Sequence, residues 1–75
     1  MIVKIYSLYG NLVSSIEYEN YKKELTIYFN NSTYGVYFGV PNHVVNSFLE
    51  SPNQDSFYSA NFRNRYHEII IEERK

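Results

Sequence analysis

Cysteine is absent from the chain, so neither disulfides nor thiolate metal sites are available to stabilise it. Long apolar runs are also absent, and none approaches the roughly 20 residues that a membrane-spanning helix needs. The first residues show no basic leader followed by an apolar segment, so we expect no signal peptide. These absences together predict a cytoplasmic protein without a membrane partner.

Chain length limits how such a protein can be stabilised. The 75 residues suffice for a single domain, residues 1–75. A domain of this size buries about 60% of the surface that its unfolded chain exposes, which leaves it marginally stable alone. Nine tyrosines and five phenylalanines are more rings than so small a core can enclose. We therefore expect some rings at the surface, in a ligand site or in an interface between subunits.

Basic residues are not in excess, because the formal net charge is -1 and the pI is about 6.1. General binding to duplex DNA needs a strong basic excess to displace counterions, so this charge disfavours it. Positive charge nevertheless gathers locally at Arg63, Arg65 and His67. Such a local basic face can hold one or two phosphates.

No catalytic or metal-binding constellation is recognisable. Neither His43 nor His67 has a carboxylate at a metal-ligand spacing. Ser14 and Ser15 have no evident base to activate them, and a glycine-rich phosphate loop is lacking. We therefore expect no enzyme activity, no metal and no cofactor.

Alternating apolar residues predict strands over residues 1–8, 12–19, 25–29 and 33–40. In the second strand, Ser14, Ile16 and Tyr18 are expected on one face and Val13 on the other. Turns are predicted at Gly10-Asn11 and over residues 20–23. The polar residues 30–32 join the third and fourth strands as a hairpin.

Two short helices are predicted after the hairpin. Pro41 ends the fourth strand and suits the first turn of a helix, whose apolar face recurs over residues 44–49. Asp55 or Ser56 can cap a second helix that runs to about residue 64. The pattern as a whole indicates an α+β fold. It would be a small antiparallel β-sheet of four to five strands, with one or two short helices packed on one face.

The apolar run Ile69-Ile70-Ile71 predicts a last strand over residues 66–72. Three adjacent isoleucines cannot all face one core from a strand, because successive side chains point to opposite faces. We therefore expect this strand to add to the sheet or to a neighbouring subunit, in a homo-oligomer. The alternative is a strand that is buried on both faces.

Aromatic residues of the fourth strand are candidates for stacking on a ligand. Alternation places Tyr34 and Phe38 on one face and Tyr37 on the other, and only one of these faces can be core. The sequence leaves open which one. Gly35 and Gly39 flank Tyr37 and would leave space around its ring, so Tyr37 is the preferred candidate, with core packing as the alternative.

Arginine supplies the complementary chemistry, since a guanidinium pairs with phosphate and stacks on bases. For Arg63 and Arg65 the alternative is a surface position at a helix end, paired with Glu68 or Glu50. The expected set of ligand-binding residues is Tyr37, Tyr58, Arg63, Arg65 and Tyr66.

An ordered series of motifs runs from residue 12 to residue 66. It consists of Val13-x-x-Ile16-x-Tyr18-Glu19, Leu25-x-Ile27-x-Phe29, Tyr37-x-x-Val40-Pro41 and Phe57-Tyr58-x-x-x-Phe62-Arg63-x-Arg65-Tyr66. In order and spacing the series resembles the KTSC domain family, which occurs at the C-terminus of some lysyl-tRNA synthetases and as free-standing bacterial and phage-like proteins. The resemblance implies a small domain for which RNA binding has been surmised.

The chain departs from the family pattern at three places. Gly35 stands at the first position of the Tyr-x-Tyr centre that the family usually carries. Asn53-Gln54-Asp55 replaces a small-Lys-Gly stretch, which weakens any phosphate contact there. Gly10-Asn11 replaces a serine pair. The resemblance therefore supports the fold more strongly than the function.

These observations support three hypotheses of function. The first is a non-catalytic oligomeric module that captures a nucleotide or short single-stranded nucleic acid by tyrosine stacking and arginine–phosphate contacts, as a phage-type sponge for a nucleotide immune signal would. The second is an RNA-binding domain. The third is a module that binds or inhibits a protein partner. The acidic pI favours the first and the third.

Overall fold

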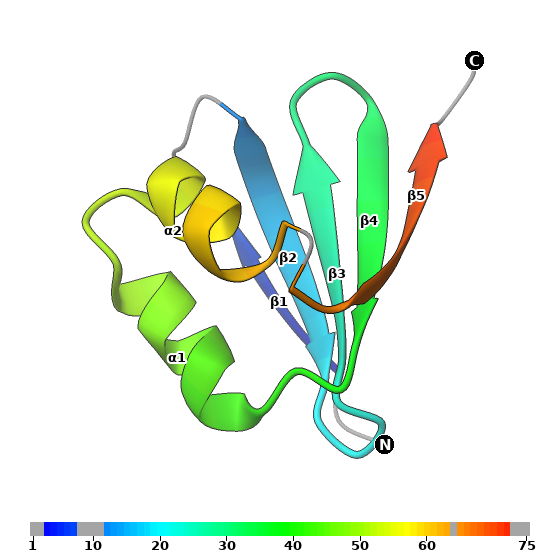
Figure 1. The fold of residues 1–75 in the computed structure, drawn as a ribbon, viewed down its shortest axis with the longest axis vertical. Coiled ribbons are helices and arrows are strands. Elements are labelled where there is room, and N and C mark those ends of the chain that lie inside the picture. Colours follow the sequence, from blue (N-terminus) through cyan, green and yellow to red (C-terminus); the bar gives the residue numbers. More distant parts are fainter. Residues whose placement is uncertain (1–2, 8–11, 64, 73–75) are drawn as a thin grey trace.

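In residues 3–7, 12–63 and 65–72, which the computed structural model describes, five antiparallel strands form one sheet and two helices lie on one face of it (Figure 1). The strands are β1 (Val3–Ser7), β2 (Val13–Glu19), β3 (Glu24–Phe29), β4 (Thr33–Phe38) and β5 (His67–Glu72). The helices α1 (Asn42–Glu50) and α2 (Gln54–Asn61) connect β4 to β5. The predicted α+β fold is confirmed, while the turn predicted at Gly10-Asn11 lies outside the described residues.

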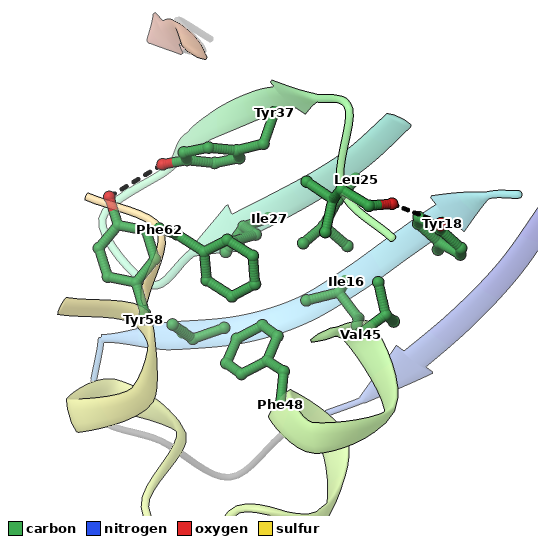
Figure 2. Close-up of a cluster of buried hydrophobic side chains, with 11 residues drawn as sticks. Ile16, Tyr18, Leu25, Ile27, Tyr37, Val45, Phe48, Tyr58 and Phe62 are labelled. Carbon is green, nitrogen blue, oxygen red and sulfur yellow. Dashed lines mark hydrogen bonds between the residues drawn. The ribbon is translucent and has the colours of Figure 1, made fainter. Parts of the chain in front are cut away.

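The core fills the space between the helices and the face of the sheet that they cover (Figure 2). Tyr18, Leu25 and Tyr37 stand side by side across β2, β3 and β4, and all three are buried. The largest side chains with no exposed surface are Tyr37, Phe48, Phe62, Ile16, Leu25, Ile27, Val13 and Val40. Neither helix of the described residues has the length and apolar character to cross a membrane.

A bulge in β2 corrects the predicted faces of that strand. The register between β2 and β3 shifts between Val13 and Ser15, so β2 holds one extra residue at this point. A bulge of this kind turns the strand and changes which face the following side chains take. As a result Val13 and Ile16 are both buried in the core, although strict alternation had placed them on opposite faces.

The connection from the sheet to α1 is held by two hydrogen bonds to Val40. The Tyr18 hydroxyl donates to the Val40 carbonyl at 2.6 Å, and the Val40 N–H donates to the Lys23 carbonyl at 3.0 Å. Gly39 makes the preceding turn with a φ of 77°, which glycine adopts without strain. Pro41 occupies the N-cap of α1 in an extended conformation, so the helix begins at Asn42, just after the residue that was predicted to lie in its first turn.

Helix α2 is capped by Asn53, whose side chain accepts a hydrogen bond from the Ser56 N–H at 3.0 Å. The prediction that Asp55 or Ser56 is the cap is therefore wrong. Asp55 lies in the first turn and accepts hydrogen bonds from the N–H groups of Leu12 and Val13, each at 3.1 Å. Its carboxylate thus ties α2 to the start of β2.

The Asp55→Ala variant is expected to lower the free energy of unfolding by about 1–3 kcal/mol, because it leaves two backbone donors without their charged acceptor. Urea denaturation of the variant and the wild type measures the difference. Glu50→Ala, which removes an exposed carboxylate from α1, is the matched control and should change the stability by less than about 0.5 kcal/mol. Equal stabilities of the two variants would contradict a tethering role for Asp55.

Candidate functional site

A pocket of about 490 Å³ lies between α2 and the end of the sheet where β3 and β4 join. Leu12, Phe29 and Ile70 provide its apolar surface, and Asn31 and Thr33 of the hairpin add polar groups. Its volume falls within the range of roughly 300–1,000 Å³ that is usual for small-molecule sites.

Tyr58, Arg63 and Glu68 complete the lining and bring two opposite charges into the pocket. Arg63 follows α2, and its exposed side chain forms no ion pair within the described part of the chain. Glu68 of β5 is half-buried, and its Oε2 atom is buried without a hydrogen-bond partner among the described residues. A desolvated carboxylate needs donors and a guanidinium needs acceptors. The pocket therefore suits a ligand that carries an anionic group together with N–H or O–H donors.

Tyr58 of the pocket lining is paired with Tyr37, which lies behind it in the core. The hydroxyl oxygens of Tyr37 and Tyr58 are 2.9 Å apart, and their rings meet edge to face with centroids 6.1 Å apart (Figure 2). Burial, together with hydrogen bonding to Tyr58 and Glu68, raises the pKa of Tyr37 above its ordinary value. Tyr37 therefore stays neutral and fixes the position of Tyr58.

The open space predicted around Tyr37 does not exist on its Gly35 side. A Cβ atom added to Gly35 would lie 2.9 Å from Tyr37 Cε1 and 2.8 Å from Ile70 Cδ1. The missing side chain of Gly35 thus makes room for the ring of Tyr37 itself, which is 0% exposed. The expectation that Tyr37 stacks on a ligand is corrected, because its ring belongs to the core.

Of the other residues expected to bind a ligand, the structure brings Tyr58 and Arg63 together at the pocket. Tyr58 is only 8% exposed, so it offers an edge and not an open face for stacking. Arg65 is exposed and does not line the pocket. The half-buried Tyr66 also lies outside the lining, and its ring is 5.7 Å from that of Phe62.

The sequence analysis missed Glu68 as a site residue and considered it only as a surface partner of arginine. The register pairs Glu68 with Tyr37 and Ile70 with Gly35, so both β5 side chains lie on the face that the helices cover. The sequence did contain an indication of this, because alternation along β5 places Glu68 on the same face as the apolar Ile70. A carboxylate on the inner face of a strand is unusual unless a partner or ligand satisfies it.

A second aromatic surface lies on the face of the sheet without helices. Tyr28 and Tyr34 are neighbours on β3 and β4, with ring centroids 5.5 Å apart. Phe38 and His67 form a similar pair with centroids 5.7 Å apart. We call Tyr28, Tyr34 and Phe38, all half-buried, the outer aromatic surface. It answers the question left open by the sequence, because Tyr34 faces away from the core and Tyr37 faces into it.

Metal binding has no support in the part of the chain that the structure describes. No group of three or more His, Cys, Asp or Glu residues is arranged there to hold a metal ion.

The comparison with known proteins concerns the fold. Residues 11–66 match the family model of the KTSC domain. The crystal structure of a KTSC domain protein from Yersinia pestis is similar with a TM-score of 0.87 and 18% sequence identity, over 93% of this chain and 99% of that chain. No curated protein matches the chain in sequence.

Stability is expected to fall as the pH rises above about 10, because the unfolded chain ionises its tyrosines near their ordinary pKa. Burial raises the pKa of Tyr37 and, together with the charge of Glu19, that of Tyr18, so both remain protonated in the folded state. Each such tyrosine lowers the stability by up to about 1.4 kcal/mol per pH unit in this range.

Urea unfolding at about pH 9 and about pH 11 tests this expectation. The Tyr37→Phe variant should lose less stability between the two conditions than the wild type does. Tyr21→Phe, at a side chain that is 77% exposed, is the control and should behave as the wild type. An identical loss in all three proteins would contradict the ionisation argument.

Proposed function

The chain belongs to the KTSC domain family, and on that premise we propose that it is a binding module without catalytic activity that captures a nucleotide in the pocket beside α2. The observation that carries this proposal is the presence in one pocket of the Arg63 guanidinium and the Glu68 carboxylate, neither of them paired with the other. Glu68 meets the Tyr37 hydroxyl, but its Oε2 atom has no hydrogen-bond partner among the described residues, so a ligand with both an anionic group and a donor fits this pocket.

A nucleotide has the required groups in a suitable arrangement. Its phosphate accepts charge-assisted hydrogen bonds from Arg63, and a guanidinium can make two such bonds in parallel. The N–H groups of a base can donate to Glu68 in the same way that bases are read along their edges. Phe29 and Ile70 supply an apolar surface for the base or the sugar. The terminal nucleotide of a short single strand would present the same groups.

Binding without chemistry is useful when a protein acts by removing its ligand from solution. A protein that sequesters a nucleotide immune signal, as a phage-type sponge does, needs a site and a sufficient copy number. It has no need of a nucleophile or a metal. We place the chain in this class.

Analysis of the natively purified protein identifies the ligand class first. An A260/A280 ratio above that of the protein alone, with a nucleotide released on denaturation and detected by mass spectrometry, is the expected result. Calorimetric titration with a panel of nucleoside monophosphates then gives affinities for the wild type and its variants.

Arg63→Gln should weaken nucleotide binding by roughly 10- to 150-fold, which corresponds to the loss of a hydrogen bond to a charged group. Arg65→Gln is the matched control, because it removes the same charge two residues away and outside the pocket lining. Circular dichroism checks that both variants fold. Equal affinities of Arg63→Gln and the wild type would show that the nucleotide does not bind at this pocket, and failure of all nucleotides to bind would reject the proposal.

A second candidate function is supported by the outer aromatic surface. Exposed rings on a helix-free sheet face are how several small domains bind single-stranded RNA. Tyr34 and Phe38 lie on the same face of β4, and Val36 lies between them on that face. Glu17 and Glu24 lie on the same face and reduce its attraction for a phosphate backbone, so we rank this function second.

Tyr34→Ala should weaken the binding of a short single-stranded RNA by roughly 5- to 150-fold if this surface is used, since stacking contributes about 1–3 kcal/mol per base. Fluorescence anisotropy at two salt concentrations measures the effect. Arg63→Gln should leave this binding unchanged. If Arg63→Gln weakens RNA binding and Tyr34→Ala does not, RNA binds through the pocket and the second candidate is rejected.

A further inference from the structure

Strand β5 has the features of an unprotected sheet edge. It lies last in the strand order, and in the described part of the chain no strand pairs with its far side (Figure 1). Ile69, Ile70 and Ile71 are 48%, 52% and 38% exposed, so the predicted alternative of a strand buried on both faces is wrong. Proteins usually guard such edges with charges, proline or a bulge. The register of β4 and β5 is continuous over these isoleucines, and none of the three devices is present at them.

We propose that β5 pairs with β5 of a second copy of this chain, antiparallel and about a two-fold axis at Ile70. In this arrangement Ile70 opposes Ile70 of the second copy, and Ile69 opposes Ile71 in both directions. The two sheets join into one continuous sheet, with the helix-covered faces on the same side. Ile70 at the centre of this interface also lines the pocket described above, so the dimer is tested by mass and cross-linking and not by nucleotide binding.

Self-complementarity is the reason for choosing a second copy as the occupant. The described strand is apolar at its centre and carries Glu68 before the three isoleucines and Glu72 after them. A two-fold axis at Ile70 matches all three isoleucines with isoleucines. Sliding the pairing by two residues would set Ile70 against Glu68 and Ile71 against His67, so apolar matching selects the register centred on Ile70.

The arrangement also covers surface that the monomer leaves open. Ile69 and Ile71 lie beside Val36 and Tyr34 on the helix-free face, while Ile70 lies over Gly35 on the covered face. A second copy paired along this edge therefore gives the side chains on both faces of β5 a neighbour on the adjoining strand.

The absence of cysteine makes a direct test possible, because a single introduced cysteine reports only on its own copy across the axis. Residues that oppose each other in antiparallel strands have Cα atoms about 4.5–5.5 Å apart, which a disulfide can bridge. Ile70→Cys should therefore form a covalent dimer rapidly under mild oxidation. Ile69→Cys should form it at least tenfold more slowly, because residue 69 of the second copy lies diagonally at about 7–8 Å.

Light scattering after size exclusion provides the second measurement. The wild type should have twice the monomer mass of 9.0 kDa. Ile70→Lys, which places two like charges at the axis, should raise the dissociation constant at least tenfold while circular dichroism shows a folded protein. The cross-linking test also needs a control. Tyr21→Cys lies in an exposed turn far from β5 in the sequence, so it measures the rate of disulfide formation by random collision.

Three outcomes would overturn the proposal. A wild type that stays at the monomer mass over the accessible concentration range removes the dimer. Cross-linking of Ile70→Cys no faster than that of Ile69→Cys or Tyr21→Cys removes the register. An unchanged mass for a folded Ile70→Lys variant places any interface elsewhere, for example at the opposite edge of the sheet.

Discussion

In the described chain, two short helices cover one face of a five-stranded sheet. They are too small to cover all of it, and this limit determines where the pocket and the exposed side of β5 lie on that face. Helices α1 and α2 together bury the centre of the sheet over β2, β3 and β4, where Phe48 and Phe62 meet Ile16 and Leu25. They do not reach across β5, so Ile70 stays half-exposed although it lies on the covered face. The pocket occupies the corner that remains between α2 and β5.

The same corner explains why a small core can carry polar chemistry. Tyr37 places its hydroxyl at the border of the core, where Tyr58 from the helix and Glu68 from β5 meet it. A neutral hydroxyl can donate and accept at once, so it satisfies neighbours of either kind without bringing a charge into the interior. The charged residues Arg63 and Glu68 line the pocket beside this hydroxyl pair.

Periodicity was sufficient to predict the strands and the apolar face of α1 because these depend on which residues avoid water. Features that depend on hydrogen bonds between distant segments were not accessible in this way. The bulge in β2 breaks the alternation that the prediction assumed, and Asp55 serves the backbone of Leu12 and Val13, about 40 positions away in the chain. The orientation of β4 could not be decided because both of its faces are aromatic. Glu68 was missed because a carboxylate among strand residues reads as solvent-exposed until the neighbouring strand is known.

Gly35 gives the pocket a character that the fold alone does not confer. Its missing side chain lets the ring of Tyr37 lie along its own strand, close enough to Gly35 that a Cβ atom there would be 2.9 Å from the ring. A family member with the Tyr-x-Tyr pattern would have a second ring in that volume and would have to turn one of the two elsewhere. The position of the Tyr58 hydroxyl, which depends on Tyr37, would then differ as well. In the proposed site, the residue at position 35 therefore influences where the Tyr58 hydroxyl stands.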